Sequence, residues 1–477
     1  MTDERDDEQL AETMRSTLRV LTRRTPVASG WRPADTVRRA VVIRRRRRWS
    51  VSAAVVLVIA VATAVSLSGG GGSGGTSHRA ADVRTADRLD GAVQLVADTA
   101  PVTNADPSAV GAVAAAEQRL ALALLDKLGG GSNVSVSPAS LYLALGMLQN
   151  GARGQTAAQI SQALQASGVS TADQNAGLAG LISELNAAAA KDGITLDSAN
   201  SLWQDRSFKI RSQFLRTLAA YYRTGVWQVD YQHDMDGALK ALNDWTSQQT
   251  HGKITKLFDQ LDPSTVLVLA NAIYFHADWA TPFDKAETAD GPFTTADGKQ
   301  VTAKFMSGGP GLRVASTDGY QAVQLPYTGN RFAAMAIMPT SGSLPDFVRG
   351  LSPAAVDSLD FTAGGGCEID LPRFSTTAKV DLKPVLQALG MSTAFSDSAD
   401  LSGLSPEATE VDQVIQRVYL GVGEKGTTAA AATGISIMPT AATSCSLRFD
   451  HPFLFLVRDT KTGAILFASE VQDPTAG

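Results

Sequence analysis

The chain has 477 residues, of which 44% are hydrophobic and 19% are charged, and a formal net charge of −5. This composition is typical of a globular protein and argues against wholesale disorder and against a protein with many membrane spans. The charge is uneven, because residues 1–48 carry thirteen Arg against seven Asp or Glu and the remaining residues sum to −11.

The sequence lacks the motifs of several common hydrolases and zinc sites. The five histidines form no H-E-x-x-H motif, no G-x-S-x-G motif occurs, and the two cysteines are not in a C-x-x-C pair. The usual signatures of metallohydrolases, serine hydrolases and zinc sites are therefore missing. We expect no enzymatic activity, no metal and no cofactor.

Residues 1–48 end in a basic run, Arg44 to Arg48, directly before an apolar stretch. Such a run could bind nucleic acid, but its position favours a role in setting membrane topology. We predict that residues 1–48 form a basic cytoplasmic segment with no nucleic-acid partner.

The next twenty residues, 49–68, contain no charge, and this is about the length that crosses a bilayer core as a helix. We predict one transmembrane helix that acts as a signal anchor, with the N-terminus cytoplasmic and the rest of the chain extracellular. Ala62-Thr-Ala64 has the form of a signal-peptide cleavage site, so the alternative is secretion after cleavage near Ala64. The long segment before the apolar stretch favours the uncleaved anchor.

The following segment, 69–108, begins with a glycine run and continues rich in Ala, Asp, Thr and Ser without an apolar period. This pattern predicts a flexible linker. From Ala109 on, apolar residues recur at helical spacing until Gly129, so we place the start of the globular domain, 109–477, here.

Several stretches of the domain predict individual elements. An alternating strand ends at Ser137-Pro138, where a helix begins with proline in its first turn. Residues 198–203 predict a strand, and 208–222 and 380–390 predict helices. Residues 267–275 are almost continuously apolar, which predicts a strand buried on both faces.

Five motifs, in order along the chain, resemble those of serpins, and in particular a membrane-tethered serpin of bacterial type. They are Asn133–Leu148, Asn150–Ile160, Leu267–Phe283, Ile369–Phe374 with Ala399–Leu404, and Gly421–Gly434 with Phe449–Gly463. The resemblance covers residues 109–475 and implies an α+β fold: helices packed around three β-sheets, a large central sheet, and an exposed reactive loop. Here one transmembrane helix would precede this fold, and we expect a monomer.

The resemblance also implies a function, that of a suicide inhibitor of serine endopeptidases. The protease would cleave the reactive loop, and the loop would then insert into the central sheet before the acyl-enzyme hydrolyses. The hinge that must enter the sheet would comprise Glu424, Gly426, Thr427, Ala429, Ala430, Ala431, Ala432 and Thr433. These residues are mostly small, so they fit either an exposed loop or a buried strand. The alternative is a non-inhibitory serpin that acts as an extracellular binding or structural module.

Counting along the loop places the cleaved bond within one residue. Sixteen residues on from Glu424 the bond is Thr440-Ala441, whereas counting back from Pro452 gives Ala441-Ala442. Either bond presents a small side chain, which suits an elastase-like or subtilisin-like protease and not a trypsin-like one.

The family's shutter and breach residues map onto Ser137, Ser140, Asn271, Trp279 and Gln416. Gln416 replaces a histidine that many serpins carry, and an amide cannot change charge between pH 5 and 8, so pH-gated opening is not supported. The resemblance also places Cys367 and Cys445 on adjacent strands of one small sheet, which makes them a candidate disulfide.

Overall fold

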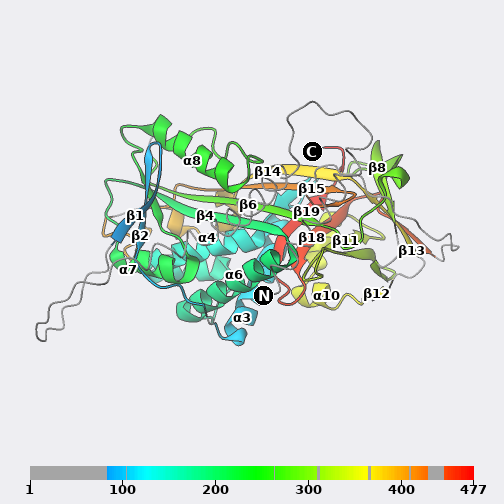
Figure 1. The fold of residues 1–477 in the computed structure, drawn as a ribbon, viewed down its shortest axis with the longest axis horizontal. Coiled ribbons are helices and arrows are strands. Elements are labelled where there is room, and N and C mark those ends of the chain that lie inside the picture. Colours follow the sequence, from blue (N-terminus) through cyan, green and yellow to red (C-terminus); the bar gives the residue numbers. More distant parts are fainter. Residues whose placement is uncertain are drawn as a thin grey trace, which may run out of the picture. The chain divides into compact units, whose positions relative to one another are not determined.

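The largest β-sheet, here called the large sheet, has eight strands in the order β1-β2-β5-β4-β6-β16-β15-β14 (Figure 1). The computed structural model describes residues 83–103, 105–262, 264–308, 312–363, 367–407, 410–427 and 445–476. The strands of the large sheet are β1 Val83–Leu89, β2 Ala92–Ala97, β4 Thr195–Asp205, β5 Val226–Val229, β6 Leu267–Asp278, β14 Phe374–Asp381, β15 Gln413–Gly423 and β16 Gly426–Thr427.

The central strand β6 explains how the large sheet is covered, because its residues are buried on both faces. Val268, Ala270 and Ala272 pack in one apolar cluster with α8, whereas Leu269 and Ile273 belong to the main core on the other face. Since side chains alternate across a strand, a nearly continuous apolar run is what a doubly covered strand requires. The predicted doubly buried strand at 267–275 is therefore confirmed.

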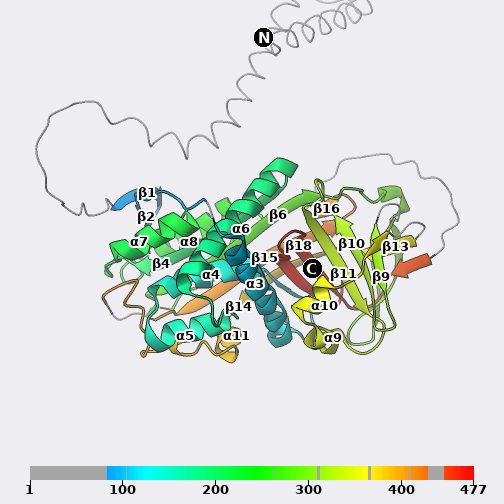
Figure 2. The ribbon, with the colours of Figure 1, turned by 90° about the horizontal axis from the view of Figure 1, so that it is seen from below.

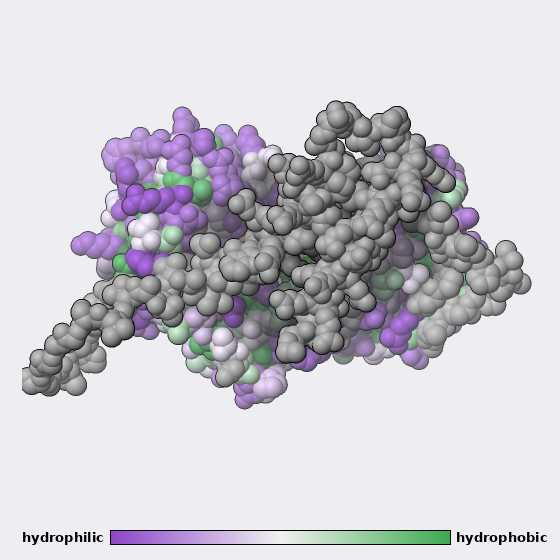
Figure 3. Space-filling model, in the orientation of Figure 1, coloured by the Kyte–Doolittle hydropathy of each residue, from purple (hydrophilic) through white to green (hydrophobic). Residues whose placement is uncertain are grey.

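Helices cover both faces of the large sheet (Figures 1 and 2). Among the described helices, α8 (Met235–Gln249) lies on one face of the sheet, where it buries Ala238, Ala241, Leu242 and Trp245 and presents a hydrophilic outer surface (Figure 3). The other helices are α3 Pro107–Leu128, α4 Pro138–Gly151, α5 Gly154–Ala163, α6 Thr171–Asp192, α7 Ser212–Thr217 with the π-helix η1 Leu218–Tyr222, α8 Met235–Gln249, α9 Leu344–Gly350, α10 Pro353–Asp357, α11 Lys383–Ala388, and the 3-10 helices η2 Lys285–Glu287 and η3 Thr393–Phe395.

Two smaller sheets complete the fold. The seven-stranded sheet has the order β12-β9-β10-β11-β18-β19-β3 and the four-stranded sheet the order β17-β13-β8-β7. Their strands are β3 Val134–Val136, β7 Ala289–Thr294, β8 Gln300–Gly308, β9 Arg313–Ser316, β10 Tyr320–Pro326, β11 Phe332–Pro339, β12 Thr362–Ala363, β13 Cys367–Pro372, β17 Cys445–Arg448, β18 Phe453–Asp459 and β19 Ile465–Val471. The predicted α+β class with three sheets is confirmed.

The prediction that residues 69–108 form a flexible linker is wrong for residues 83–97. Residues 83–97 form the antiparallel hairpin β1–β2, which pairs through β2 with β5 at the edge of the large sheet. Strand β1 is exposed along almost its whole length, so its sequence carries no apolar alternation. Pairing with an open sheet edge, and not the local pattern, decides its conformation. Helix α3 also begins at Pro107, two residues before the predicted start of the domain.

Two predicted helices also differ in the structure. The stretch 208–222 divides into α7 and a π-helical turn, and residues 380–381 of the second stretch end strand β14 before α11 begins. In the second case Val380 and Asp381 still pair with β15. Both are weak helix formers, so the strand continues through them and the helix begins later.

In the part of the chain that the structure describes, α3 is the helix with the length and hydropathy to cross a membrane. It is a core helix, because 61% of its most apolar stretch is buried. It is distinct from the predicted span, 49–68, which lies outside the described residues.

Two glutamates are buried where α3 packs on β19. Glu117 on α3 accepts a hydrogen bond from the Ile465 amide at 2.8 Å, and Glu470 on β19 accepts one from the Gln472 side chain at 3.0 Å. Burial raises the pKa of Glu117 to about 8 and that of Glu470 to about 7. A carboxyl group with a raised pKa in the folded state stabilises the fold most below its unfolded pKa, and this stability is lost as the pH rises through the folded value.

We therefore predict that Glu470→Gln raises the midpoint of thermal unfolding at pH 9 and has little effect at pH 5. The free energy of unfolding at pH 9 should rise by about 3 kcal/mol, because burial raises the pKa of Glu470 from 4.5 to about 7 and each pKa unit corresponds to about 1.4 kcal/mol. Calorimetry of the two proteins across this pH range measures it. Glu287→Gln, at an exposed position of η2, is the control and should change neither midpoint; an equal gain at both pH values for Glu470→Gln would contradict the role of ionisation.

Candidate functional site

The two central strands of the large sheet, β6 and β15, pair with each other over only part of their length. They run parallel and pair from Val268 opposite Gln413 to Ile273 opposite Val418. Beyond this point the two-residue strand β16 lies between them, with Thr427 opposite Val422 of β15 and Gly426 opposite Asp278 of β6. The large sheet is therefore closed at one end and parted at the other, where the chain after β15 turns back and enters. We call this parted end the entry site.

The turn that leads into the entry site is held by backbone and side-chain hydrogen bonds from the loop after β6. Trp279 donates through its indole Nε1 to the Gly423 carbonyl at 2.9 Å and through its amide to the Lys425 carbonyl at 2.7 Å. The Phe283 amide donates to the Glu424 carbonyl at 2.8 Å. The Glu424 carboxylate accepts from Thr288 at 3.1 Å and pairs with Arg373 at 3.4 Å. The direction of the entering strand is thus fixed from several sides.

The first two entering residues fit the entry site closely. A Cβ on Gly426 would lie 2.0 Å from the Ala277 carbonyl oxygen, so any other residue would push β16 away from β6. The Thr427 side chain is fully buried, and its hydroxyl lies 2.5 Å from the Tyr327 hydroxyl. Tyr327 in turn stacks on Trp279, with ring centroids 4.5 Å apart. This pocket accepts a small polar side chain and leaves no room for a long or charged one.

A buried polar cluster joins β15, β6 and the start of α4 at the closed end of the sheet. Gln416 and Asn271, which lie opposite each other, are joined by a hydrogen bond of 2.5 Å from Gln416 Nε2 to Asn271 Oδ1. Gln416 also accepts from the Ser137 amide at 2.9 Å and donates to the Ser137 carbonyl at 3.0 Å. Asn271 donates to the Ser140 hydroxyl at 2.6 Å. We call Ser137, Ser140, Asn271 and Gln416 the shutter cluster.

Hydrogen bonds within the shutter cluster join β6, β15 and α4 at the closed end of the sheet. All four side chains are fully buried, so parting β6 from β15 here would leave several polar groups without partners. Each such group costs about 1–3 kcal/mol. The amide of Gln416 performs this bridging with both its oxygen and its nitrogen.

Sequence reasoning missed several residues that extend the site. Ser135 lies 2.7 Å from both Thr376 and Ser469, which joins β3, β14 and β19. Asn200 of β4 accepts hydrogen bonds from Ser140 and Asn271. Serine and threonine in otherwise apolar strands were the available signal, but only tertiary contact reveals which of them face one another.

Most of the predicted loop lies outside the described residues, so its structure is not described: Ala429, Ala430, Ala431, Ala432, Thr433, Thr440, Ala441 and Ala442. The two cysteines lie on the four-stranded sheet, where Cys367 of β13 is opposite Cys445 of β17 in a parallel pair. Cys367 is disulfide-bonded. Among the described residues no group of three His, Cys, Asp or Glu could hold a metal ion. The entry site already holds one short strand, β16, between β6 and β15.

Comparisons with known proteins agree with this geometry. The family model "Serpin (serine protease inhibitor)" matches residues 115–474. An uncharacterized serpin-like protein of Thermococcus kodakarensis is 31% identical over 357 residues, which cover 73% of this chain and 82% of that protein. Iripin-2 of Ixodes ricinus is 34% identical over 368 residues, covering 75% of this chain and 92% of the relative.

Solved structures give the same result. The native state of the thermophilic serpin tengpin has a TM-score of 0.71 and 26% identity, covering 79% of this chain and 97% of that chain. Human glycosylated kallistatin has a TM-score of 0.70 and 26% identity, covering 77% of this chain and all of its own. The chain belongs to the serpin family.

Proposed function

We propose that the protein inhibits serine endopeptidases by inserting its cleaved reactive loop into the large sheet, between β6 and β15. The observation that supports this most strongly is β16, which already lies between these two strands at the entry site. A loop whose first residues pair with both neighbours needs only to extend that pairing toward the closed end of the sheet.

The energetics favour such an extension once the loop is cut. A strand added between two others forms backbone hydrogen bonds on both sides, and each contributes about 1 kcal/mol net. Successive side chains alternate between faces, so after Thr427 the inward positions are Ala429, Ala431 and Thr433. All are small enough to be buried. The shutter cluster is the barrier that keeps the uncut protein from completing this change.

The proposed targets are elastase-like or subtilisin-like proteases, since either candidate bond, Thr440-Ala441 or Ala441-Ala442, presents a small side chain. A non-inhibitory serpin that serves as a binding module is the second candidate. The hinge sequence favours the inhibitor over the non-inhibitory serpin. A charged or bulky inward residue or a proline would block insertion, and the hinge sequence contains none of these.

We further propose that the serpin domain is tethered to the outside of the cell membrane by residues 49–68, as a monomer. The uncharged stretch and the preceding arginines support this topology. The alternative is a protein secreted after cleavage near Ala64.

We also propose that Cys367 is bonded to Cys445. Cys367 is in a disulfide, and the register of β13 and β17 places these two residues, the chain's only cysteines, directly opposite each other. Such a bond would hold β17, the strand that follows the loop, on the four-stranded sheet. Insertion of the uncut loop would require β17 to leave that sheet, so the bond would oppose it.

The first prediction concerns the hinge. The unmodified domain should form an SDS-resistant complex with elastase or subtilisin, whereas Thr427→Arg should be cleaved as a substrate without trapping either protease. The reason is that an arginine beside Tyr327 would be buried without a counter-charge, which costs several kcal/mol.

The matched control is Thr428→Arg, one residue on, where alternation predicts a solvent-facing side chain. This variant should still trap the protease. Unchanged stoichiometry of inhibition in Thr427→Arg, or complete loss in both variants, would be incompatible with the insertion mechanism. If the unmodified domain traps neither protease, the proposed targets are wrong.

The second prediction concerns topology. Protease added to intact protoplasts should remove the serpin domain and leave a membrane fragment that contains roughly the first 70 residues, the length of the basic segment with one bilayer-spanning helix. N-terminal sequencing of the released and retained fragments measures this. A mature N-terminus near Val65 would instead establish secretion.

The third prediction concerns the cysteines. Reduction, or Cys445→Ser, should accelerate spontaneous loss of inhibitory activity on warming, because β17 is then free to leave the four-stranded sheet. The initial rate of inhibition should stay nearly unchanged, since cleavage separates the inserting segment from Cys445. Cys367→Ser should behave identically. Two titratable thiols in the unreduced domain would disprove the bond.

A further inference from the structure

Two buried carboxyl groups lie where α3 packs on β19, one at each end of that strand. Glu117 of α3 is 1% exposed and contacts the Ile465 amide at the start of β19. Glu470, near the end of β19, is fully buried beside the C-terminal end of α3. Carboxylates are almost never fully buried unless they are paired, so both groups need a physical explanation.

The surroundings of Glu470 suit a protonated carboxyl group. A Cβ on Gly129 would lie 2.6 Å from Glu470 Oε1 and 2.8 Å from the Leu125 carbonyl oxygen, so these two oxygens approach the same point at the end of α3. Neither Glu470 Oε1 nor the side-chain oxygen of the neighbouring Gln472 has a hydrogen-bond partner among the described residues. A carboxylate here would face acceptors and the negative end of the helix dipole. A proton on Glu470 removes the charge and supplies a donor.

The charged groups on the elements packed against β19 are engaged with other partners. These contacts join Lys127 and Arg349 to Asp126, Arg458 to Asp357, Arg331 to Asp459, Arg119 to the Gln165 carbonyl, and Asp473 to the Thr475 amide. Tyr142 of α4 lies near Glu117, and burial raises the pKa of its hydroxyl above the usual range, so it stays neutral. Strand β3 carries no ionisable side chain. Glu470 therefore has no counter-charge within the described residues.

Strand β3 connects Glu470 with the shutter cluster. In the β19–β3 pair, Glu470 lies opposite Val134 and the next pair contains Ser135. The Ser135 hydroxyl reaches β14 at 2.7 Å. Ser137 follows β3 directly, and its amide and carbonyl hold Gln416 of β15 at 2.9 and 3.0 Å. A displacement of β3 from β19 would therefore pull on the hydrogen bonds that join the strands at the closed end of the large sheet.

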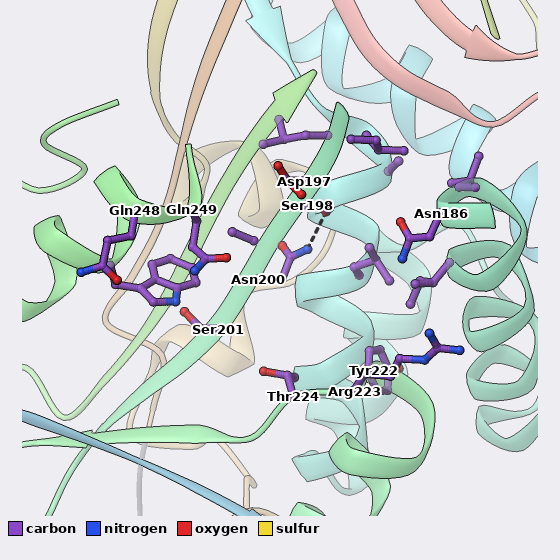
Figure 4. Close-up of a pocket in the computed structure, with 18 of the residues that line it drawn as sticks. Asn186, Asp197, Ser198, Asn200, Ser201, Tyr222, Arg223, Thr224, Gln248 and Gln249 are labelled. Atoms are coloured by element: carbon purple, nitrogen blue, oxygen red, sulfur yellow. Dashed lines mark hydrogen bonds between the residues drawn. The ribbon is translucent and has the colours of Figure 1, made fainter. Parts of the chain in front are cut away.

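The same contacts continue from the shutter cluster to β4. Ser140, at the start of α4, lies 3.2 Å from the side-chain oxygens of Ser198 and Asn200. Asn200 in turn donates to Ser198 at 2.9 Å (Figure 4). Because α4 follows β3 after a single residue, a movement of β3 would disturb contacts to β4 as well as those to β15.

We propose that Glu470 is a pH-sensitive latch on the large sheet: when it is protonated it keeps β3 on β19 and the shutter cluster closed, and its ionisation releases β3 and lets the sheet open more readily. A carboxylate without a counter-charge favours conformations that bring it to solvent. Gln416 itself cannot titrate, so the latch acts on the shutter cluster through Ser137. The consequence for inhibition rests on the proposed function, whereas the pH-dependent opening does not.

The ionisation of Glu470 sets the direction and size of the effect. Its pKa is raised from 4.5 to about 7 in the closed structure. The latch therefore stabilises the closed state fully below pH 4.5, and this stability is lost as the pH rises to 7. Between pH 5 and pH 8 the opening equilibrium should shift by up to roughly a hundredfold. Glu117 contacts Ile465, which lies outside the β19–β3 pair, so it stays buried when β3 leaves.

Opening is measured by hydrogen–deuterium exchange of the β3 and β15 amides, with each rate divided by the intrinsic rate at the same pH. In the unmodified protein, protection should fall by up to roughly a hundredfold from pH 5 to pH 8 and level off above pH 7. In Glu470→Gln protection should stay constant, because the amide is neutral and supplies a donor, as the protonated carboxyl group does.

The matched control is Glu287→Gln, at an exposed position, which should behave as the unmodified protein does. Protection that is constant in the unmodified protein, or that falls equally in Glu470→Gln, would overturn the latch. If Glu470→Gln does not fold, the profile of the unmodified protein decides, because a fall that does not level off near pH 7 would exclude Glu470 as its source.

The link to inhibition is tested by the rate at which the protein loses its capacity to trap protease on warming. The unmodified protein and Glu287→Gln should lose it faster at pH 8 than at pH 5, and Glu470→Gln should lose it equally fast at both. Protection that falls with pH while this rate stays constant would contradict the link to loop insertion and leave the latch established. A protein that traps no protease at either pH would contradict the inhibitory function, whereas the exchange measurement would still decide the latch.

Discussion

The structure depends on one constraint, the incomplete pairing of the parallel strands β6 and β15. At one end these strands pair with each other and are further joined by the side-chain hydrogen bonds of the shutter cluster. At the other they are held apart by two residues of the chain that follows β15. Where β6 and β15 are parted, their backbone groups can pair with a strand between them, and the proposed insertion of the loop depends on this.

The two ends of the β6–β15 pair are stabilised in different ways, and both ways matter for the proposed mechanism. At the entry site, the fit of small residues determines which side chains can enter, because Gly426 contacts the backbone of β6 and the Thr427 hydroxyl is buried against Tyr327. At the closed end, buried polar groups hold the strands together, because Gln416 and Asn271 form hydrogen bonds with Ser137 and Ser140 at the start of α4. In the proposed mechanism, extension from the entry site requires the closed end to open.

The sequence by itself determined the family, the doubly buried strand β6 and the small residues of the hinge. These features are local: an apolar run at 267–275 must be covered on both faces, and a Gly-Thr-Thr-Ala run can be buried whatever surrounds it. The order of five motifs then indicated an α+β fold with a large central sheet, and the structure has that fold.

Tertiary structure decided those strands and buried groups whose contacts come from residues distant in the chain. Strand β1 has no apolar pattern, so the sequence suggested a linker there; it is a strand because it pairs with β2, which in turn pairs with β5 of the large sheet. Val380 and Asp381 joined the β14–β15 ladder although the sequence favoured a helix. The raised pKa values of Glu117 and Glu470 arise from burial where α3 packs on β19. In each case the deciding contact lies far along the chain, where local pattern carries no information about it.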